Sequence, residues 1–263
     1  MDITGRTALL TGATGGIGHA IARALHARGA KLILTGRRTD VLEPLADEVS
    51  GTALAADLSR QLDVEKLIEE AGHADIVVHN AALPASGDIL SFNPEQLDRA
   101  LDVNLRAPMV ISRHFAETLS GRGSGHIVFI SSLSGKSGQG GAAVYSATKF
   151  GIRGFAQGLR GDLAATGVGV SCVFPGFIRD AGMFHESGTQ LPKGVGTSTP
   201  EEVAGGVVSA IEQNRFEVDV APVGMRVMTS VASLAPATAA KLAARFGGAK
   251  IASDLAAGQR DKR

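Results

Sequence analysis

Cysteine is almost absent from this chain of 263 residues, where Cys172 is the only one. A disulfide framework is therefore excluded, and the predicted location is a reducing compartment, the cytoplasm. The 7 histidines are scattered, and no group of His and Cys has the spacing of metal ligands, so no metal site is predicted. Tryptophan is missing altogether, and Tyr145 is the only tyrosine.

An excess of charge and long apolar runs are lacking as well. Lys and Arg number 26, as do Asp and Glu, which leaves no basic stripe for nucleic-acid phosphates and no charged tail to grip a membrane or chromatin. No run approaches the roughly 20 apolar residues of a membrane span. The first residues, Met1 to Arg6, lack the order of a signal peptide, so secretion is not expected.

Short apolar runs alternate with longer stretches of helical periodicity over the first two-thirds of the chain, a pattern typical of a parallel sheet. The predicted strands are Thr7–Leu10, Lys31–Leu34, Thr52–Ala55, Ala74–His79, His126–Ile130, Val168–Phe174 and a possible seventh, Phe216–Val220. The predicted helices are Ile17–Arg28, Arg38–Val49, Leu62–Ala71, Pro94–Leu119, Ala143–Ala165 and Pro200–Asn214. The sequence predicts an α/β fold, a Rossmann-like doubly wound parallel sheet of six or seven strands with helices on both faces.

Two segments interrupt this alternation. Residues 177–199 form a long connection rich in Gly, Ser and Thr, which favours a mobile lid. Residues 221–263 form a short helical extension with an Ala-rich stretch containing Lys241 and Arg245. Packing onto the sheet or onto a subunit partner, a substrate lid and a membrane-surface helix all fit this extension. We therefore predict a dinucleotide-binding catalytic domain over 1–220 and a C-terminal extension over 221–263.

A glycine-rich turn, Thr11-Gly12-Ala13-Thr14-Gly15-Gly16-Ile17-Gly18, follows the first predicted strand and runs directly into a helix. Glycines let the backbone approach a pyrophosphate, and the new helix offers it free N–H groups and a positive dipole end. A glycine motif alone is weak evidence. With a strand before it and a helix after it, it predicts a dinucleotide site.

The end of the second predicted strand decides which dinucleotide fits. A carboxylate there would hold a ribose 2′-hydroxyl, and a cation would hold a 2′-phosphate. No acid occupies this strand end, and Arg37 and Arg38 follow it. NADP(H) is therefore preferred over NAD(H), which stays possible because both arginines could simply be solvated at a helix start. Asp57 and Asn80 follow the third and fourth strands and should face the same crevice.

The single tyrosine has a lysine, Lys149, four residues further on. On a helix this spacing puts phenol and ammonium on one face, and the cation is expected to lower the phenol pKa from about 10, toward a value suited to proton transfer. The strand ending at Ser132 precedes Tyr145 by 13 residues and brings a hydroxyl to the same crevice. Tyrosine on a helix is more often a packing residue, so this pair gains weight only from its neighbours.

Together these residues resemble the short-chain dehydrogenase/reductases, over Gly5 to about Val220. The resemblance implies that Tyr145 is the general acid/base, that Ser132 hydrogen-bonds the substrate oxygen, that Lys149 binds the nicotinamide ribose and that Asn104 holds a water in a proton relay. The cofactor site expected from the sequence and the resemblance comprises Gly12, Thr14, Gly16, Ile17, Gly18, Arg37, Arg38, Asp57, Leu58, Asn80, Ala81, Tyr145, Lys149, Pro175, Gly176 and Ile178.

Three positions depart from the pattern of that family. Gly15 stands where NADP-dependent members often have a basic residue, and Asp180 stands where a threonine commonly contacts the carboxamide. Gly12, Gly15 and Gly18 also have the spacing of the longer, epimerase-like members. The 114 residues after Lys149 are too few for the substrate domain of those members.

The predicted activity is the NADP(H)-dependent interconversion of a carbonyl and an alcohol, with reduction as the working direction. Alternatives are a catalytically silent NADP(H)-binding scaffold or sensor and an epimerase-like enzyme with retained cofactor. Small residues of the loop 133–141 and the apolar Phe177, Met183 and Phe184 suggest an apolar substrate of moderate size. Lys136 and Arg179 are interpreted as solvated loop charges rather than acid-binding groups. A homodimer or homotetramer is expected from the resemblance.

Overall fold

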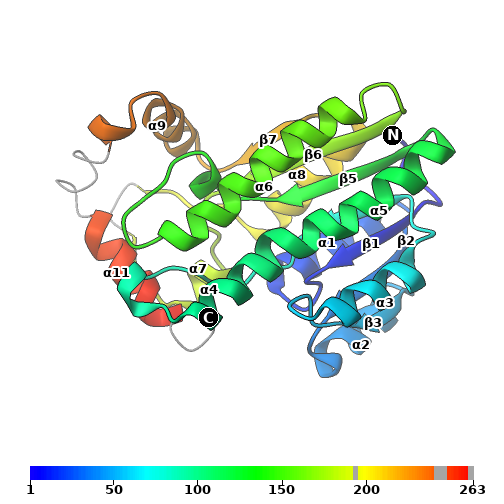
Figure 1. The fold of residues 1–263 in the computed structure, drawn as a ribbon, viewed down its shortest axis with the longest axis horizontal. Coiled ribbons are helices and arrows are strands. Elements are labelled where there is room, and N and C mark those ends of the chain that lie inside the picture. Colours follow the sequence, from blue (N-terminus) through cyan, green and yellow to red (C-terminus); the bar gives the residue numbers. More distant parts are fainter. Residues whose placement is uncertain (192–194, 240–247, 260–263) are drawn as a thin grey trace.

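The computed structural model describes residues 1–191, 195–239 and 248–259 and contains one parallel sheet of seven strands (Figure 1). The strand order is β3-β2-β1-β4-β5-β6-β7, and every neighbouring pair is parallel. The strands are β1 (Thr7–Thr11), β2 (Lys31–Gly36), β3 (Thr52–Ala55), β4 (Ile76–His79), β5 (Gly125–Ile130), β6 (Val168–Pro175) and β7 (Glu217–Val220). The predicted doubly wound α/β sheet is confirmed, including its seventh strand.

Helices cover both faces of the sheet, which explains why its central strands are apolar throughout. One face packs against α1 (Gly16–His26), α2 (Thr39–Glu48) and α8 (Pro200–Glu212). The other packs against α3 (Gln61–Ala71), α5 (Ala107–Arg122) and α6 (Ala143–Asp162). Thr199 caps α8 in a capping box with Glu202.

The single helix predicted over Pro94–Leu119 is wrong, because the chain divides there into three parts. These are α4 (Pro94–Leu101), the π-helical turn η2 (Asp102–Arg106) and α5. Pro108, at the start of α5, has no N–H to offer the carbonyl four residues earlier, that of Asn104. The helix therefore widens for one turn at Asn104, at the edge of the site described below.

The long connection over 177–199 has structure of its own. The short helix α7 (Gly182–Glu186) lies between two irregular stretches of this connection. Its ends are joined, since Ser198 N donates to Phe177 O at 2.9 Å and Arg179 N donates to Ser198 O at 2.9 Å. Residues 192–194 lie outside the described part. The segment is thus a closed loop over the carboxyl ends of the strands, the place that a lid requires.

After β7 the described chain consists of α9 (Val223–Leu234) and α11 (Gly248–Gln259), at one end of the molecule (Figure 1). The first turns of α9 approach the sheet, and α11 contacts α7, where Gln259 Nε2 donates to Met183 O at 3.2 Å. Lys241 and Arg245 lie outside the described residues. Within 1–191, 195–239 and 248–259, no helix has both the length and the apolar character needed to cross a membrane. The boundary at residue 220 stays a prediction.

Two buried histidines predict acid sensitivity. Burial lowers the pKa of His79 on β4 and of His126 on β5 to about 3, against about 6.5 in an unfolded chain. Below about pH 6.5 the unfolded chain binds protons that the folded chain does not, so the free energy of unfolding falls. The expected loss between neutral pH and about pH 5 is about 2 kcal/mol for each histidine, measurable by urea unfolding.

A variant of one buried histidine measures the contribution of that residue alone. His126→Gln removes the titrating group while keeping a polar side chain next to Ser171 Oγ, which lies 2.8 Å from His126 Nε2. The pH-dependent loss should shrink by about half in this variant and stay unchanged in His73→Gln, at an exposed position. Equal pH profiles for the wild type and His126→Gln would contradict the assignment.

Candidate active site

A cavity of about 2680 Å³ opens beyond the carboxyl ends of the strands. Each residue of the predicted cofactor site lines this cavity, and so does Ser132. Asn104 does not line it and lies one layer behind, 2% exposed. The structure therefore brings together residues from six of the seven strand ends, at the edge of the sheet where open α/β folds bind their ligands.

The glycine turn is shaped by close backbone approaches. Gly12 has a φ of +65°, and a Cβ on it would lie 2.6 Å from Ala81 Cα. A Cβ on Gly18 would lie 2.4 Å from Gly12 O, so the start of α1 can pack on the turn only as glycine. Asn80 Nδ2 donates to Gly12 O at 2.9 Å and holds the turn in place.

The N-terminus of α1 is free to receive an anion. Gly15 occupies the N-cap position without any side-chain hydrogen bond to the first turn, and that turn carries no acidic residue. Its backbone N–H groups and the positive end of the helix dipole point at the cavity wall formed by Gly15 and Gly16. This cradle, which Cβ atoms would fill, fits the pyrophosphate of a dinucleotide.

Two arginines and one aspartate lie at the ends of β2 and β3. Arg37 and Arg38 are exposed, and Arg38 donates from Nη2 to Thr14 O in the glycine turn. Burial alone would raise the pKa of Asp57, but hydrogen bonds from Ser59 and the charge of Arg37 hold it below the ordinary value. The guanidinium of Arg37 thus lies in the lining of the cavity, and no carboxylate stands at the end of β2 next to it.

Ser132, Tyr145 and Lys149 meet at the centre of the cavity wall. Ser132 lies two residues after β5, caps the short turn Leu133–Gly135, and forms a side-chain hydrogen bond with Tyr145. One helical turn further along α6, Lys149 Nζ lies 5.6 Å from the centre of the Tyr145 ring and donates to Ile130 O at 2.9 Å. Hydroxyl, phenol and ammonium therefore lie close together in the lining of the cavity.

The expected lowering of the Tyr145 pKa is wrong for this structure. Burial raises the pKa of Tyr145 to about 12, and only the hydrogen bond with Ser132 opposes that effect. Burial also lowers the pKa of Lys149 to about 8, so its ammonium is still the main form at neutral pH. Lys149 Nζ donates to Ile130 O instead, and its charge does not offset the cost of burying a phenolate.

The buried side chain of Asn104 lies behind the cavity wall and contacts Leu83 and Thr148. Its Oδ1 accepts from Leu83 N at 2.6 Å and its Nδ2 donates to Leu83 O at 3.0 Å. Nδ2 also lies 3.5 Å from Thr148 Oγ1, next to Lys149 on α6. These contacts join the side chain to the loop after β4 and to α6, while the backbone carbonyl of Asn104 lacks the helical donor that Pro108 cannot supply.

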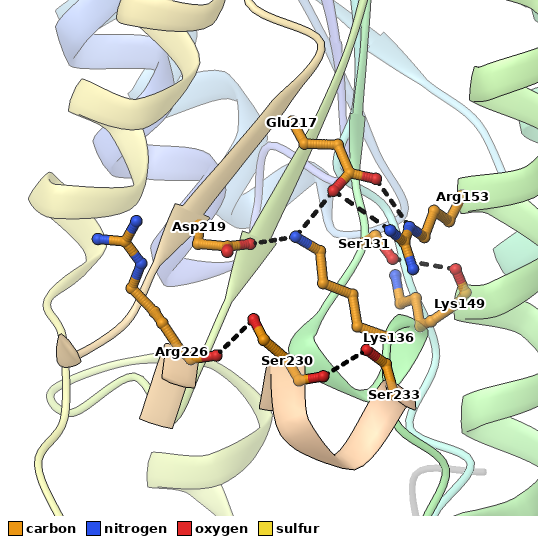
Figure 2. A network of polar contacts seen from close by, with 9 residues as sticks. All are labelled: Ser131, Lys136, Lys149, Arg153, Glu217, Asp219, Arg226, Ser230 and Ser233. Carbon is orange, nitrogen blue, oxygen red and sulfur yellow. Dashed lines mark hydrogen bonds and ion pairs between the residues drawn. The ribbon is translucent and has the colours of Figure 1, made fainter. Parts of the chain in front are cut away.

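A polar network that the sequence did not predict connects the site to the edge strand β7 (Figure 2). Lys136 Nζ lies 2.9 Å from Glu217 Oε2 and 2.6 Å from Asp219 Oδ1, and 4.0 Å from the centre of the Phe174 ring. Arg153 Nε lies 2.7 Å from Glu217 Oε1. The interpretation of Lys136 as a solvated charge is wrong, because its side chain is only 13% exposed.

Glu217 thereby connects two parts of the cavity lining. Lys136 follows the turn that carries Ser132, and Arg153 continues the face of α6 that carries Tyr145 and Lys149. Both cations line the cavity. A single carboxylate on β7 is thus paired both with the turn that follows Ser132 and with the helix of Tyr145.

Sequence reasoning also missed the contribution of the extension to the cavity. Met225 and Met228 of α9 and Leu255 of α11 line it, facing Phe177 and Phe184 of the loop over 177–199, whose rings lie 4.9 Å apart. The apolar character of residues 223–234 was the available signal. Asp180 and Arg179 form an exposed ion pair of 3.5 Å and do not line the cavity, so Asp180 does not replace the family threonine there.

Sheet and site together define a nicotinamide-dependent oxidoreductase. Residues 6–192 match the model of the short chain dehydrogenase family, and the chain belongs to that family. A ketoacyl reductase, HetN, from a Nostoc species is 35% identical over 225 residues, 82% of this chain and 78% of the relative. A 3-oxoacyl-[acyl-carrier-protein] reductase from Rickettsia conorii is 36% identical over 181 residues, 68% of this chain and 75% of the relative.

Solved structures agree with this assignment. A short-chain dehydrogenase from Sphingobium yanoikuyae in complex with NADPH has a TM-score of 0.76 at 26% identity, covering 81% of this chain and 87% of that one. A putative betaketoacyl-ACP reductase has a TM-score of 0.76 at 29% identity, covering 83% of this chain and 98% of that one. The sequence relatives and the solved structures therefore agree on the fold, the family and a nicotinamide cofactor.

Proposed function

We propose that this protein reduces an apolar ketone or aldehyde with NADPH and that Tyr145 is its general acid. The observation that carries the proposal is the hydrogen-bonded Ser132–Tyr145 pair in the cavity wall, one helical turn from the buried ammonium of Lys149. A phenol with a raised pKa stays protonated at neutral pH, so it has a proton to give to a carbonyl oxygen.

Each residue of the group has a distinct part in this proposal. When bound, the nicotinamide cofactor supplies the hydride that the carbonyl carbon accepts. Ser132 donates a hydrogen bond to the carbonyl oxygen and orients it toward Tyr145, which donates its proton to the same oxygen. Lys149 holds the ribose of the cofactor and stabilises the phenolate that remains after proton transfer. The Asn104 carbonyl holds a water that returns a proton through Lys149.

NADP(H) is the proposed cofactor because Arg37 and Arg38 stand where a 2′-phosphate would lie and no carboxylate follows β2. Arg37→Glu is expected to weaken NADPH binding by about 100-fold and NADH binding by less than about threefold, because a charge-assisted bond becomes a repulsion only for the phosphate. Titration of both nucleotides measures the two constants.

The matched control for this prediction is Arg60→Glu. It makes the same charge change at an exposed arginine that does not line the cavity. Both nucleotides should bind to it as they bind to the wild type. An equal loss of NADPH and NADH affinity in Arg37→Glu would defeat the assignment of NADP(H).

The proposed substrate class rests on four apolar residues that line the same cavity as Tyr145, namely Phe177, Phe184, Met225 and Met228. Lys136 is engaged by Glu217 and Asp219 and Arg179 by Asp180, so neither is offered to an acidic substrate. Two relatives are named as reductases of ketoacyl or 3-oxoacyl groups, which carry a keto group on an acyl chain, and such a substrate is compatible with this apolar lining. A cytoplasmic homodimer or homotetramer remains part of the proposal.

Turnover tests this function directly. The purified protein is mixed with NADPH and a panel of aliphatic, aromatic and 3-oxoacyl ketones, and NADPH consumption is followed by its absorbance. Consumption that depends on an apolar ketone supports the proposal. NADPH binding without consumption across the panel would leave the silent scaffold or sensor. Tightly retained cofactor and substrate isomerisation without net consumption would indicate the epimerase-like alternative.

A further inference from the structure

The loop over 177–199 lies directly against the glycine turn. A Cβ on Gly16 would overlap the Cβ of Ala181 and would lie 3.5 Å from its Cα, so nothing separates the two segments there. Gly16, Gly182 and Met183 all line the cavity. A nucleotide with its pyrophosphate on the glycine turn would therefore have α7 as a neighbour, and the position of α7 would decide how easily the nucleotide leaves.

Helix α7 needs support from other elements. It has 5 residues, too few for a helix that is stable by itself. The hydrogen bonds of Ser187 stay within the same segment, because its N and its Oγ donate to Phe184 O at 3.2 and 2.7 Å and its Oγ lies 2.8 Å from Thr189 Oγ1. These bonds shape the segment but do not attach it to the rest of the molecule.

Helix α11 of the C-terminal extension supplies an attachment and lies beside α7 (Figure 1). Gln259, which is 3% exposed, donates from Nε2 to Met183 O at 3.2 Å. One residue earlier, a Cβ on Gly258 would lie 2.7 Å from Ser187 Cα, so the two backbones approach more closely than any other side chain would allow. The last turn of α11 thus contacts both ends of α7.

The buried amide of Gln259 is satisfied on one side only. Its Oε1 has no hydrogen-bond partner among residues 1–191, 195–239 and 248–259. A buried acceptor without a partner costs free energy, which water would return if α11 and α7 separated. This contact is therefore weaker than its burial suggests, and it can open while the sheet stays folded.

We propose that α11 is a latch for α7, and that Gly258 and Gln259 are positioning residues that set the rate at which the nucleotide leaves. Gln259 holds Met183, which follows directly on the residues that lie against the glycine turn. Separation of α11 would release α7 and open the path from the cavity. The inference rests on the proposed nucleotide site. It concerns a part of the chain that the family match over residues 6–192 does not include.

The release of NADPH tests the latch. NADPH bound to the full chain is displaced by excess NADP⁺, and the loss of its fluorescence gives the dissociation rate. Gly258→Ala should raise this rate about fivefold, because the added methyl group collides with Ser187 although alanine favours a helix more than glycine does. Gln259→Met keeps the length of the side chain but loses the donor to Met183 O, and it should raise the rate to a similar extent.

A second measurement follows α7 in the absence of nucleotide. Chymotrypsin cleavage after Phe177 and Phe184, located by mass spectrometry, should be faster in both variants than in the wild type. The matched controls are Gly205→Ala and Gln213→Met, which make the same exchanges at exposed positions that do not line the cavity. A Cβ on Gly205 meets no atom within 4 Å. Both controls should release NADPH and resist cleavage like the wild type.

The outcomes separate the latch from the nucleotide site. Failure of the wild type to bind NADPH would contradict the nucleotide site on which the latch rests. Normal binding with a wild-type release rate in Gly258→Ala and Gln259→Met would overturn the latch alone. Faster release without faster cleavage of the loop would also overturn it, because α7 would not have moved. Equal acceleration in the two controls would count against it as well, since the effect would not depend on the contact between α11 and α7.

Discussion

Replacement of Tyr145 by phenylalanine is expected to lower kcat for ketone reduction by about 1000-fold while changing NADPH affinity only a few-fold. The substitution removes one oxygen and leaves the ring against Ala85, Ala100 and Val144, so the wall of the cavity keeps its shape. What is lost is the proton donor, and the carbonyl oxygen would then develop negative charge with only Ser132 to stabilise it. Steady-state kinetics and nucleotide titration measure the two quantities separately.

The same variant is the control for an absorbance titration of the Tyr145 phenol. Because the chain has one tyrosine and no tryptophan, phenolate absorbance reports on this residue alone, and Tyr145→Phe should show no titrating band. The wild type should titrate near a pKa of about 12 without nucleotide. NADP⁺ should lower that pKa, because a positive ring beside the phenol favours the phenolate, and NAD⁺ should do so less at equal concentration.

Two results would contradict the role of Tyr145. One is activity of Tyr145→Phe above about a tenth of the wild type, since general acid catalysis contributes more than that. The other is a phenol pKa that ignores NADP⁺, which would mean that the nicotinamide does not reach Tyr145. The silent binding module would then become the leading interpretation, because the glycine turn would still bind nucleotide.

The sheet was predictable because each strand has a local signature. Buried parallel strands such as β5 and β6 are apolar on both faces, so their runs are continuous and easily recognised. The predicted strands differ from the observed ones by at most two residues at an end. The break at Asn104 was missed because the periodicity of the apolar residues continues through it, and only the missing N–H of Pro108 indicates the wider turn.

In the site, too, groups of residues that are close in the sequence were predictable, whereas contacts between residues far apart in the sequence were not. The glycine turn and the pair Tyr145 and Lys149 each occupy a short stretch of sequence, so their spacing and their neighbours along the chain were enough to predict a common site. The partners of Lys136 could not be predicted from spacing, because Asp219 is 83 positions away in the sequence. The pairing of β6 and β7 brings it near. The raised pKa of Tyr145 was missed for a related reason, since burial depends on the whole fold.

The second large effect is expected at Lys136. Lys136→Met should lower the free energy of unfolding by about 2 kcal/mol, because Glu217 and Asp219 lose a cation in a partly buried setting. Methionine preserves the packing on Phe174, so the loss reports charge rather than volume. Since Lys136 also anchors the turn of Ser132, kcat should fall about tenfold with little change in the KM for NADPH. Urea unfolding and steady-state kinetics measure these effects.

The control is Lys66→Met, because Lys66 pairs with Glu70 at 3.6 Å while remaining 71% exposed. An exposed pair of this kind contributes less than about 0.5 kcal/mol, so stability and activity should both be preserved. Lys136→Arg should recover most of the activity if a cation bridging two carboxylates is what positions Ser132. Equal, small effects of Lys136→Met and Lys66→Met would show instead that β7 and the Ser132 turn hold their places without the network, and that apolar packing around Phe174 sets the geometry of the catalytic group.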